Sequence, residues 1–99
     1  QVKIRGHRVE LKEVEAAVAA HPDVVDVVAR AVPADGGPQL AAWAAVTPGS
    51  PLTPDALRRH LLAKVPGYLV PAVVTLMDRL PRTPGGKLDP RALPAPAPR

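Results

Sequence analysis

The sequence predicts an α+β domain of two layers, in which two or three helices pack on a roughly three-stranded sheet, with a short N-terminal β-hairpin. Two observations lead to this class. Two stretches with helical apolar spacing alternate with three runs of strand length, in the order extended segment, helix, strand, strand, helix, strand, loop. The chain has 99 residues, of which 46% are hydrophobic, so it can form a single domain with a modest core.

The first segments are predicted to form a hairpin and a helix. Residues 1–9 are expected to be extended, with a turn near Gly6. A helix is expected over residues 11–20, because it separates an apolar face from a charged one. The apolar face is predicted to hold Leu11, Val14, Ala17 and Val18, and the face in water to hold Lys12, Glu13 and Glu15.

Two strands are expected next. Residues 24–32 are rich in β-branched side chains, and residues 40–46 form a second apolar run of strand length. The six-residue connection over 33–38 favours an antiparallel pair. In the first strand, Asp26 and Arg30 interrupt one face, and the clean apolar face is predicted to hold Val25, Val27, Ala29 and Ala31.

The C-terminal half is predicted to add a helix, a strand and a loop. The helix begins with Thr53 as N-cap and Pro54 at its first position, and it ends before a Pro-Gly pair. A strand over 72–76, a Gly- and Pro-rich loop over 80–89 and one last helical turn over 89–93 are expected to follow. The buried stripe of the helix is predicted to be Leu57, Leu61 and Val65.

Composition excludes several function classes. The chain has no cysteine, so it can form neither disulfides nor thiolate metal sites. The net charge of +4 comes from basic residues dispersed among acidic ones, and the only aromatics, Trp43 and Tyr68, are too few for stacking on nucleic acid. There is no apolar run of membrane-span length and no signal-peptide pattern. We expect a cytoplasmic protein that binds neither nucleic acid nor membrane.

Familiar catalytic and metal-binding patterns are also missing. No histidine has a second ligand at metal spacing, and Ser50, the only serine, lacks a nucleophile-elbow motif. We therefore predict no metal site in this chain. The paired carboxylates are interpreted as solvated surface; they are Glu13 with Glu15 and Asp23 with Asp26.

One lysine stands in a turn that suits contact with a ligand. Lys87 directly follows Gly85 and Gly86, and glycines allow a backbone to approach a ligand closely. A lysine at that point can place one compact positive charge on a phosphate or a carboxylate. The leading glycine and the Ser/Thr of a Walker phosphate loop are absent. Taken alone, the pattern is typical of an ordinary turn with a solvated lysine.

Three segments together resemble a known family. Residues 1–15 resemble the eighth core motif of nonribosomal peptide synthetase adenylation domains, residues 65–71 the ninth, and residues 80–89 the tenth. They occur in the family's order and spacing and span nearly the whole chain. The resemblance implies a small C-terminal subdomain over residues 1–93, followed by a Pro/Ala-rich linker over residues 94–99.

The resemblance implies a two-step activity for the enzyme to which such a subdomain belongs. An amino acid reacts with Mg-ATP to give an aminoacyl-adenylate, and the acyl group then passes to the phosphopantetheine thiol of a peptidyl carrier protein. ATP and Mg²⁺ would be bound mainly by the large N-terminal subdomain. The small subdomain would rotate between the steps and present a different face each time. We expect the isolated 99 residues to fold but to be inactive.

Particular residues match the family's motifs. Lys87 matches the catalytic lysine that bridges the substrate carboxylate and ATP, and Gly6 matches the loop glycine that lines the pantetheine channel. The resemblance further implies Gly86 and Arg8 as adenylate-proximal residues, and Arg5 and His7 as members of the pantetheine-channel loop.

Two alternatives remain open. The chain could be the same subdomain of an acyl-CoA or aryl-acid ligase, or a non-catalytic binding module with this fold. The Leu88-Asp89 pair after the lysine and the proline-rich exit favour the peptide synthetase. The strand-like start without an initiator Met and the proline-rich end are expected of a piece cut from a longer polypeptide.

Overall fold

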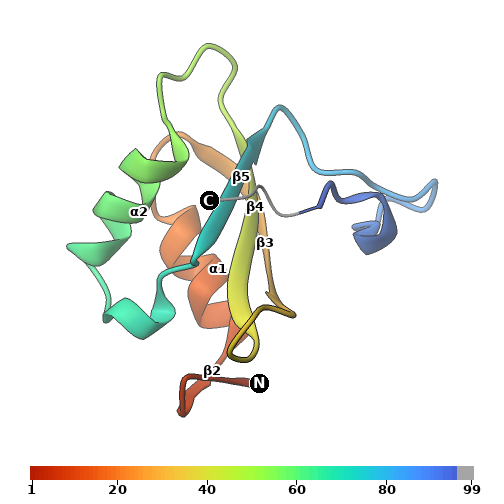
Figure 1. Ribbon diagram of the computed structural model, residues 1–99. Helices are drawn as coiled ribbons and strands as arrows, with labels where there is room; N and C mark the ends of the chain where they lie inside the picture. Colours follow the sequence, from red (N-terminus) through yellow and green to blue (C-terminus); the bar gives the residue numbers. More distant parts are fainter. Residues whose placement is uncertain (96–99) are drawn as a thin grey trace.

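The computed structural model describes residues 1–95, and it confirms the predicted α+β class (Figure 1). The last four positions of the expected linker over 94–99 lie outside the described residues. The elements are β1 (Val2–Ile4), β2 (His7–Val9), α1 (Leu11–Ala19), β3 (Val24–Val32), β4 (Gln39–Val46), α2 (Pro54–Leu62), the 3₁₀ turn η1 (Gly67–Leu69), β5 (Val73–Met77) and the 3₁₀ turn η2 (Pro90–Ala92).

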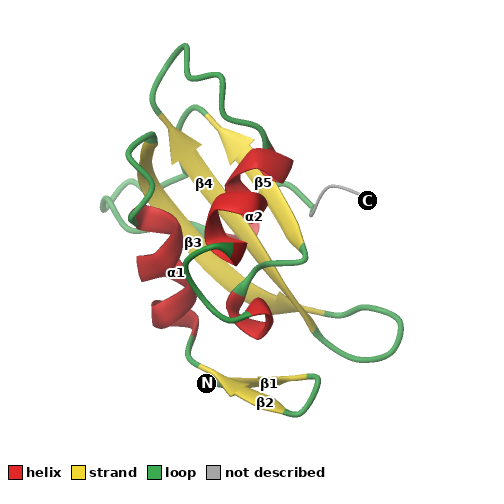
Figure 2. Ribbon diagram, turned by 90° about the vertical axis from the view of Figure 1, so that its left-hand side faces the viewer, coloured by secondary structure: helices red, strands yellow, loops and turns green. Residues whose placement is uncertain are grey.

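The strands form a hairpin and a mixed sheet. β1 pairs with β2 in the hairpin, and the sheet has the order β3-β4-β5. β3 and β4 are antiparallel, as predicted, whereas β4 and β5 are parallel, and the crossover that a parallel pair requires contains α2. Figure 2 shows both helices on one face of the sheet. Within residues 1–95, no helix has the length and apolar character needed to cross a membrane.

The helices pack on the sheet through the predicted apolar stripes. Val14 and Val18 of α1 and Leu57 and Leu61 of α2 are completely buried. The predicted start of α2 is also confirmed, because the Thr53 hydroxyl accepts a hydrogen bond from a backbone N–H of the first turn at 3.1 Å. These contacts place the helices as one layer and the sheet as the next.

The opposite face of the sheet is covered by the chain that follows β5. Trp43 and Leu80 are buried there, and Leu88 and Leu93 pack against the same cluster. The Trp43 indole N–H donates to the carbonyl oxygen of Pro94 at 2.8 Å. Figure 1 shows this segment, in blue, on the side of the sheet away from α1 and α2. The irregular segment after β5 therefore covers this face of the sheet, as α1 and α2 cover the other face.

The predicted apolar face of β3 is wrong at Val25. The pairing register with β4 shifts between Val24 and Asp26, and this bulge leaves Val25 64% exposed. Val24 is buried on the helix side in its place, together with the partly buried Val27. A bulge adds one residue to a strand and so moves the residues before it to the other face. From Val27 onward, the predicted alternation holds.

Three of the four carboxylates that were predicted to be solvated surface have protein partners, whereas Glu13 is exposed as predicted. Glu15 on α1 accepts a hydrogen bond from the backbone N–H of Ala29 at 2.9 Å. Asp23 accepts one from the Ser50 hydroxyl at 2.7 Å. Asp26 forms an ion pair with an arginine of the C-terminal segment. The sequence pattern places each carboxylate on a face, but the segment that meets it comes from elsewhere in the chain.

Candidate functional site

Lys87 lies on a tight hairpin in the C-terminal segment. Arg82 and Leu88 pair across it as an isolated antiparallel bridge. The Thr83 N–H donates to the Lys87 carbonyl at 2.7 Å, and the Gly86 N–H donates to the Thr83 carbonyl at 2.9 Å. The two hydrogen bonds close the turn, so the backbone position of Lys87 is fixed relative to Thr83.

The residues of this turn explain its shape. Pro84 follows the first turn residue, where its fixed φ is favoured. Gly86 has a φ of 85°, a left-handed conformation that glycine adopts without strain. A turn followed by one left-handed residue is a common three-residue hairpin loop. Lys87 comes directly after it, and its exposed side chain is free to contact a docked partner.

The base of the Lys87 hairpin is attached to the sheet by apolar packing and by one ion pair. Leu80 and Leu88 belong to the cluster around Trp43. The Arg82 guanidinium donates to the carboxylate of Asp26 on β3. Sequence reasoning missed this pair because its members are 56 positions apart. The only signal for this ion pair in the sequence is that Asp26 interrupts the strand face that points away from the helices.

The second group of predicted site residues lies on the β1–β2 hairpin. Ile4 and His7 are paired, and the two residues between them, Arg5 and Gly6, have φ values of 49° and 84°. Two positive φ values are typical of the type I′ turn, whose twist matches that of the strands. A Cβ at Gly6 would meet no atom within 4 Å. Within this chain, only the backbone conformation favours glycine there.

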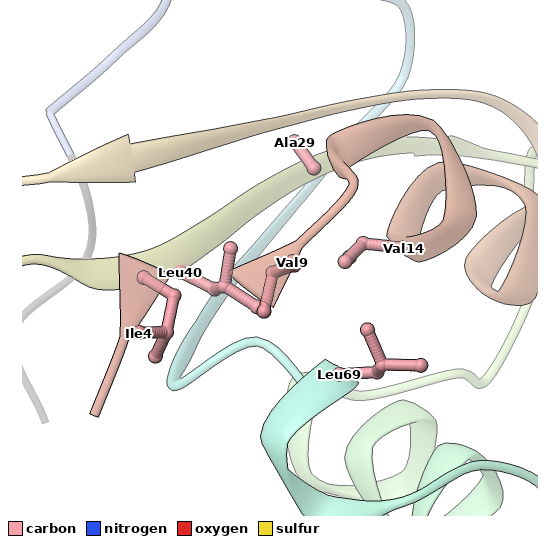
Figure 3. Close-up of a cluster of buried hydrophobic side chains, with 6 residues drawn as sticks. All are labelled: Ile4, Val9, Val14, Ala29, Leu40 and Leu69. Carbon is pink, nitrogen blue, oxygen red and sulfur yellow. The ribbon is translucent and has the colours of Figure 1, made fainter. Parts of the chain in front are cut away.

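The β1–β2 hairpin is attached to the domain by its core residues and by a ring stack. The His7 ring lies flat on the Tyr68 ring of η1, with centroids 4.3 Å apart and an angle of 4° between the planes. Sequence reasoning had assigned no role to Tyr68 beyond its motif. Figure 3 shows the hydrophobic cluster that holds the strands, made of Ile4, Val9, Val14, Ala29, Leu40 and Leu69.

A cleft of about 360 Å³ opens beside this ring stack. Arg58 lies in its wall, where its Nε donates to the Pro71 carbonyl at 3.1 Å. Leu62, also in the wall, is 56% exposed. The wall thus combines a cation with apolar surface, next to the residues predicted for the pantetheine channel; the other lining residues include Arg5, Gln39 and Ala72.

The structure does not bring the two hairpins together. In Figure 1 the β1–β2 hairpin lies at the bottom of the domain, and the blue segment that contains Lys87 lies at the right, on the other face of the sheet. Lys87 and Gly86 therefore form one group. The second group, on or between β1 and β2, consists of Arg5, Gly6, His7 and Arg8. Arg8 shares its hairpin with Gly6 and not with Lys87.

The three histidines do not converge with other metal ligands. His21 and His60 meet edge to face, with ring centroids 4.7 Å apart, and His7 stacks on Tyr68 instead. In the part of the chain that the structure describes, no group of three or more His, Cys, Asp or Glu side chains could hold a metal ion.

Fold and hairpins together define a small α+β module with two exposed hairpin tips, and the sequence assigns its family. The family model described as "AMP-binding enzyme C-terminal domain" matches residues 13–87, so Lys87 is the last residue matched. The chain therefore belongs to the family of AMP-binding enzyme C-terminal domains.

Several synthases and synthetases are similar to this chain. The dimodular nonribosomal peptide synthase of Bacillus subtilis is 47% identical over 97% of this chain, which spans 4% of that protein. Surfactin synthase subunit 1 of the same species is 43% identical over 94% of this chain and 3% of its own length. The structure of the amide bond synthetase McbA from Marinactinospora thermotolerans matches with a TM-score of 0.79 and 29% identity, over 89% of this chain and 18% of that one. The chain thus corresponds to a small part of each relative.

Proposed function

We propose that residues 1–93 form the mobile C-terminal subdomain of an amino-acid-activating adenylation domain in a nonribosomal peptide synthetase, and that residues 94–99 form a linker. The observation that carries this proposal is the 47% identity to a dimodular nonribosomal peptide synthase over 97% of the chain. The separation of the two hairpins supports it, because a subdomain that docks differently in two steps needs two distinct faces (Figure 1).

In the adenylation step, Lys87 would act as the mobile cation. A carboxylate oxygen of the amino acid attacks the α-phosphorus of ATP, an O–P bond forms, and the bond to pyrophosphate breaks. Negative charges come together in this transition state, and a preorganised ammonium group offsets them. The exposed position of Lys87 after Gly86 suits such an approach. ATP, Mg²⁺ and the amino acid would be held mainly by the large N-terminal subdomain.

In the thioester-forming step, the β1–β2 hairpin would face the reaction. The phosphopantetheine thiol of the peptidyl carrier protein attacks the acyl carbonyl carbon, a C–S bond forms, and AMP leaves. Gly6, with no side chain at an exposed tip, would leave the path of the thiol open. Arg5 and His7 would flank this path, and Arg8 would lie near the phosphate of the adenylate.

The experiment that tests this proposal compares the two steps in the intact enzyme that contains this chain. In Lys87→Ala, amino-acid-dependent ATP–pyrophosphate exchange should fall by about 10²–10³-fold. Transfer of a preformed aminoacyl-adenylate to the carrier protein should be largely retained. Lys64→Ala, which removes another exposed lysine, is the matched control and should change neither step. Unchanged exchange in Lys87→Ala would favour a non-catalytic binding module. The isolated 99 residues should show no exchange.

A second candidate is the same subdomain of a ligase with another acceptor, such as an acyl-CoA or aryl-acid ligase. The observation that favours it is the fold shared with an acyl-CoA synthetase of Brucella canis, at 26% identity and a TM-score of 0.73. The choice of acceptor separates the two candidates. If the peptide synthetase proposal is right, the intact enzyme should transfer its acyl group to a phosphopantetheinylated carrier protein and not to free coenzyme A.

A further inference from the structure

The ion pair between Arg82 and Asp26 lies at the base of the Lys87 hairpin. It is the only salt bridge within residues 1–95. The tip of the hairpin is otherwise held by its own hydrogen bonds, since Thr83 bonds to Gly86 and to Lys87. Those internal bonds fix the shape of the turn, but they leave its direction relative to the sheet to the residues at the base.

Asp26 is held firmly enough to serve as an anchor. One of its carboxylate oxygens accepts a hydrogen bond from the backbone N–H of Val27 at 3.0 Å, and the other accepts from Arg82. Asp26 follows the bulge at Val25, and bulges re-aim the neighbouring side chains of a strand. Because β3 is paired with β4 along nearly its whole length, the carboxylate is fixed to the sheet itself.

Arg82 links the position of Asp26 on the sheet to the position of Lys87. Arg82 pairs across the hairpin with Leu88, the residue that directly follows Lys87. A shift of the Arg82 backbone therefore moves Lys87 as well. We infer that Arg82 and Asp26 form a positioning pair that orients the Lys87 hairpin on the sheet for the adenylation step. This role presupposes the function proposed above for Lys87, and it requires no contact between the pair and the substrate.

Because both side chains of the pair are exposed, the ion pair can contribute only a little to the stability of the fold. The side chains of Arg82 and Asp26 are 46% and 36% exposed, and ion pairs of this kind contribute little to folding. Catalysis is far more sensitive to placement, because an error of about 1 Å in a reacting group can cost on the order of 100-fold in rate. Loss of the pair should therefore slow adenylation while the domain stays folded.

The test uses the intact enzyme and measures both half-reactions in Arg82→Gln, Asp26→Asn and the double variant. Each single change should lower kcat for pyrophosphate exchange by about tenfold, with KM for ATP and amino acid unchanged. The double variant should be no slower than the slower single one, as expected for two members of one interaction. Transfer from a preformed adenylate to the carrier protein should be unchanged in all three. Arg79→Gln, an exposed arginine three residues earlier, is the control and should match the parent enzyme.

Three results would overturn this inference. If Arg82→Gln slows exchange and Asp26→Asn does not, Arg82 acts on its own, on ATP or on the large subdomain. If both half-reactions fall together, the pair supports the fold in general. If neither variant slows exchange although Lys87→Ala does, Lys87 is catalytic without this support. Only unchanged exchange in Lys87→Ala itself would contradict the underlying function.

Discussion

The two candidate hairpins expose their tips by different physical means. The β1–β2 hairpin turns in two residues, and one of them, Arg5, is a non-glycine residue at a φ of 49°. The Lys87 hairpin turns over three residues, and its single left-handed position is a glycine, Gly86. A stack between His7 and Tyr68 supports the first hairpin, whereas an ion pair supports the second.

This difference matters because the two attachments lie on opposite sides of the sheet. The first hairpin shares the hydrophobic cluster beneath α1, and the second rests on the cluster around Trp43. Substitutions at distant sites that share no contact partners act nearly independently of each other. A substitution in either hairpin should therefore affect one half-reaction and spare the other.

The largest effect on the thioester-forming step is expected from a side chain at Gly6. Gly6→Leu should lower transfer to the carrier protein by on the order of 100-fold, because the added side chain would obstruct the thiol. Pyrophosphate exchange should be retained. Both steps can be measured in the same preparation of the intact enzyme.

The control for Gly6→Leu is a glycine with the same backbone conformation in a different place. Gly49 has a φ of 81°, and a Cβ there also meets no atom within 4 Å. Gly49→Leu thus introduces the same backbone strain away from both hairpins. If Gly49→Leu slows thiol transfer as much as Gly6→Leu does, backbone strain and not obstruction is the cause.

The contrast between the hairpins also shows what can be read from the sequence. Both turns were predictable, because Gly and Pro punctuate them and because helix and strand periods frame them. The contacts that attach the two hairpins to the domain were not predictable. Tyr68 and Asp26 are far from their partners along the chain, and a single sequence carries no record of which distant residues meet.

The bulge at Val25 was unpredictable for a related reason. Alternation of apolar residues in 24–32 is compatible with either register, and the pairing with β4 decides which residues face the helices. The exposed fraction of 64% at Val25 reflects that choice. The family's motifs identified Lys87 and Gly6 as candidates, but the arrangement of these two residues on separate faces of the domain follows from the three-dimensional fold.

The second-largest effect among these variants is expected at Gly86, the left-handed glycine that precedes Lys87. Gly86→Ala places a Cβ at a φ of 85°, which should cost about 1–2 kcal/mol of unfolding free energy in urea titrations of the chain. Exchange should fall with it in the intact enzyme, because the turn that carries Lys87 is distorted. Gly85→Ala is the matched control, because Gly85 has no positive φ. A Cβ added at Gly85 would have the Thr83 hydroxyl as its nearest neighbour, at 3.8 Å, which is an ordinary contact distance. Equal losses for the two variants would show that the left-handed conformation is not what matters.

A smaller effect is expected from the ring stack. Tyr68→Leu removes the partner of His7, and stacked rings contribute about 0.5–1.5 kcal/mol beyond the area they bury. Transfer to the carrier protein should fall several-fold, and exchange should be unchanged. Tyr68→Phe keeps the ring and should behave like the parent enzyme. A loss of exchange in Tyr68→Leu would contradict the separation of the two hairpins.

The smallest effect is expected at Arg5, where the β1–β2 hairpin departs from the usual chemistry of its turn. Type I′ turns favour Asn-Gly, and this chain has Arg-Gly, with Arg5 at a φ of 49°. Arg5→Asn should raise the free energy of unfolding by about 0.5 kcal/mol, because asparagine tolerates the left-handed region better than arginine. If the Arg5 side chain serves the thiol path or the adjoining cleft, transfer to the carrier protein should nevertheless slow. Arg5→Lys keeps the charge without relieving the backbone, so it should leave both stability and transfer near the parent values. A gain in stability with faster transfer in Arg5→Asn would mean that the arginine has no part in the second half-reaction.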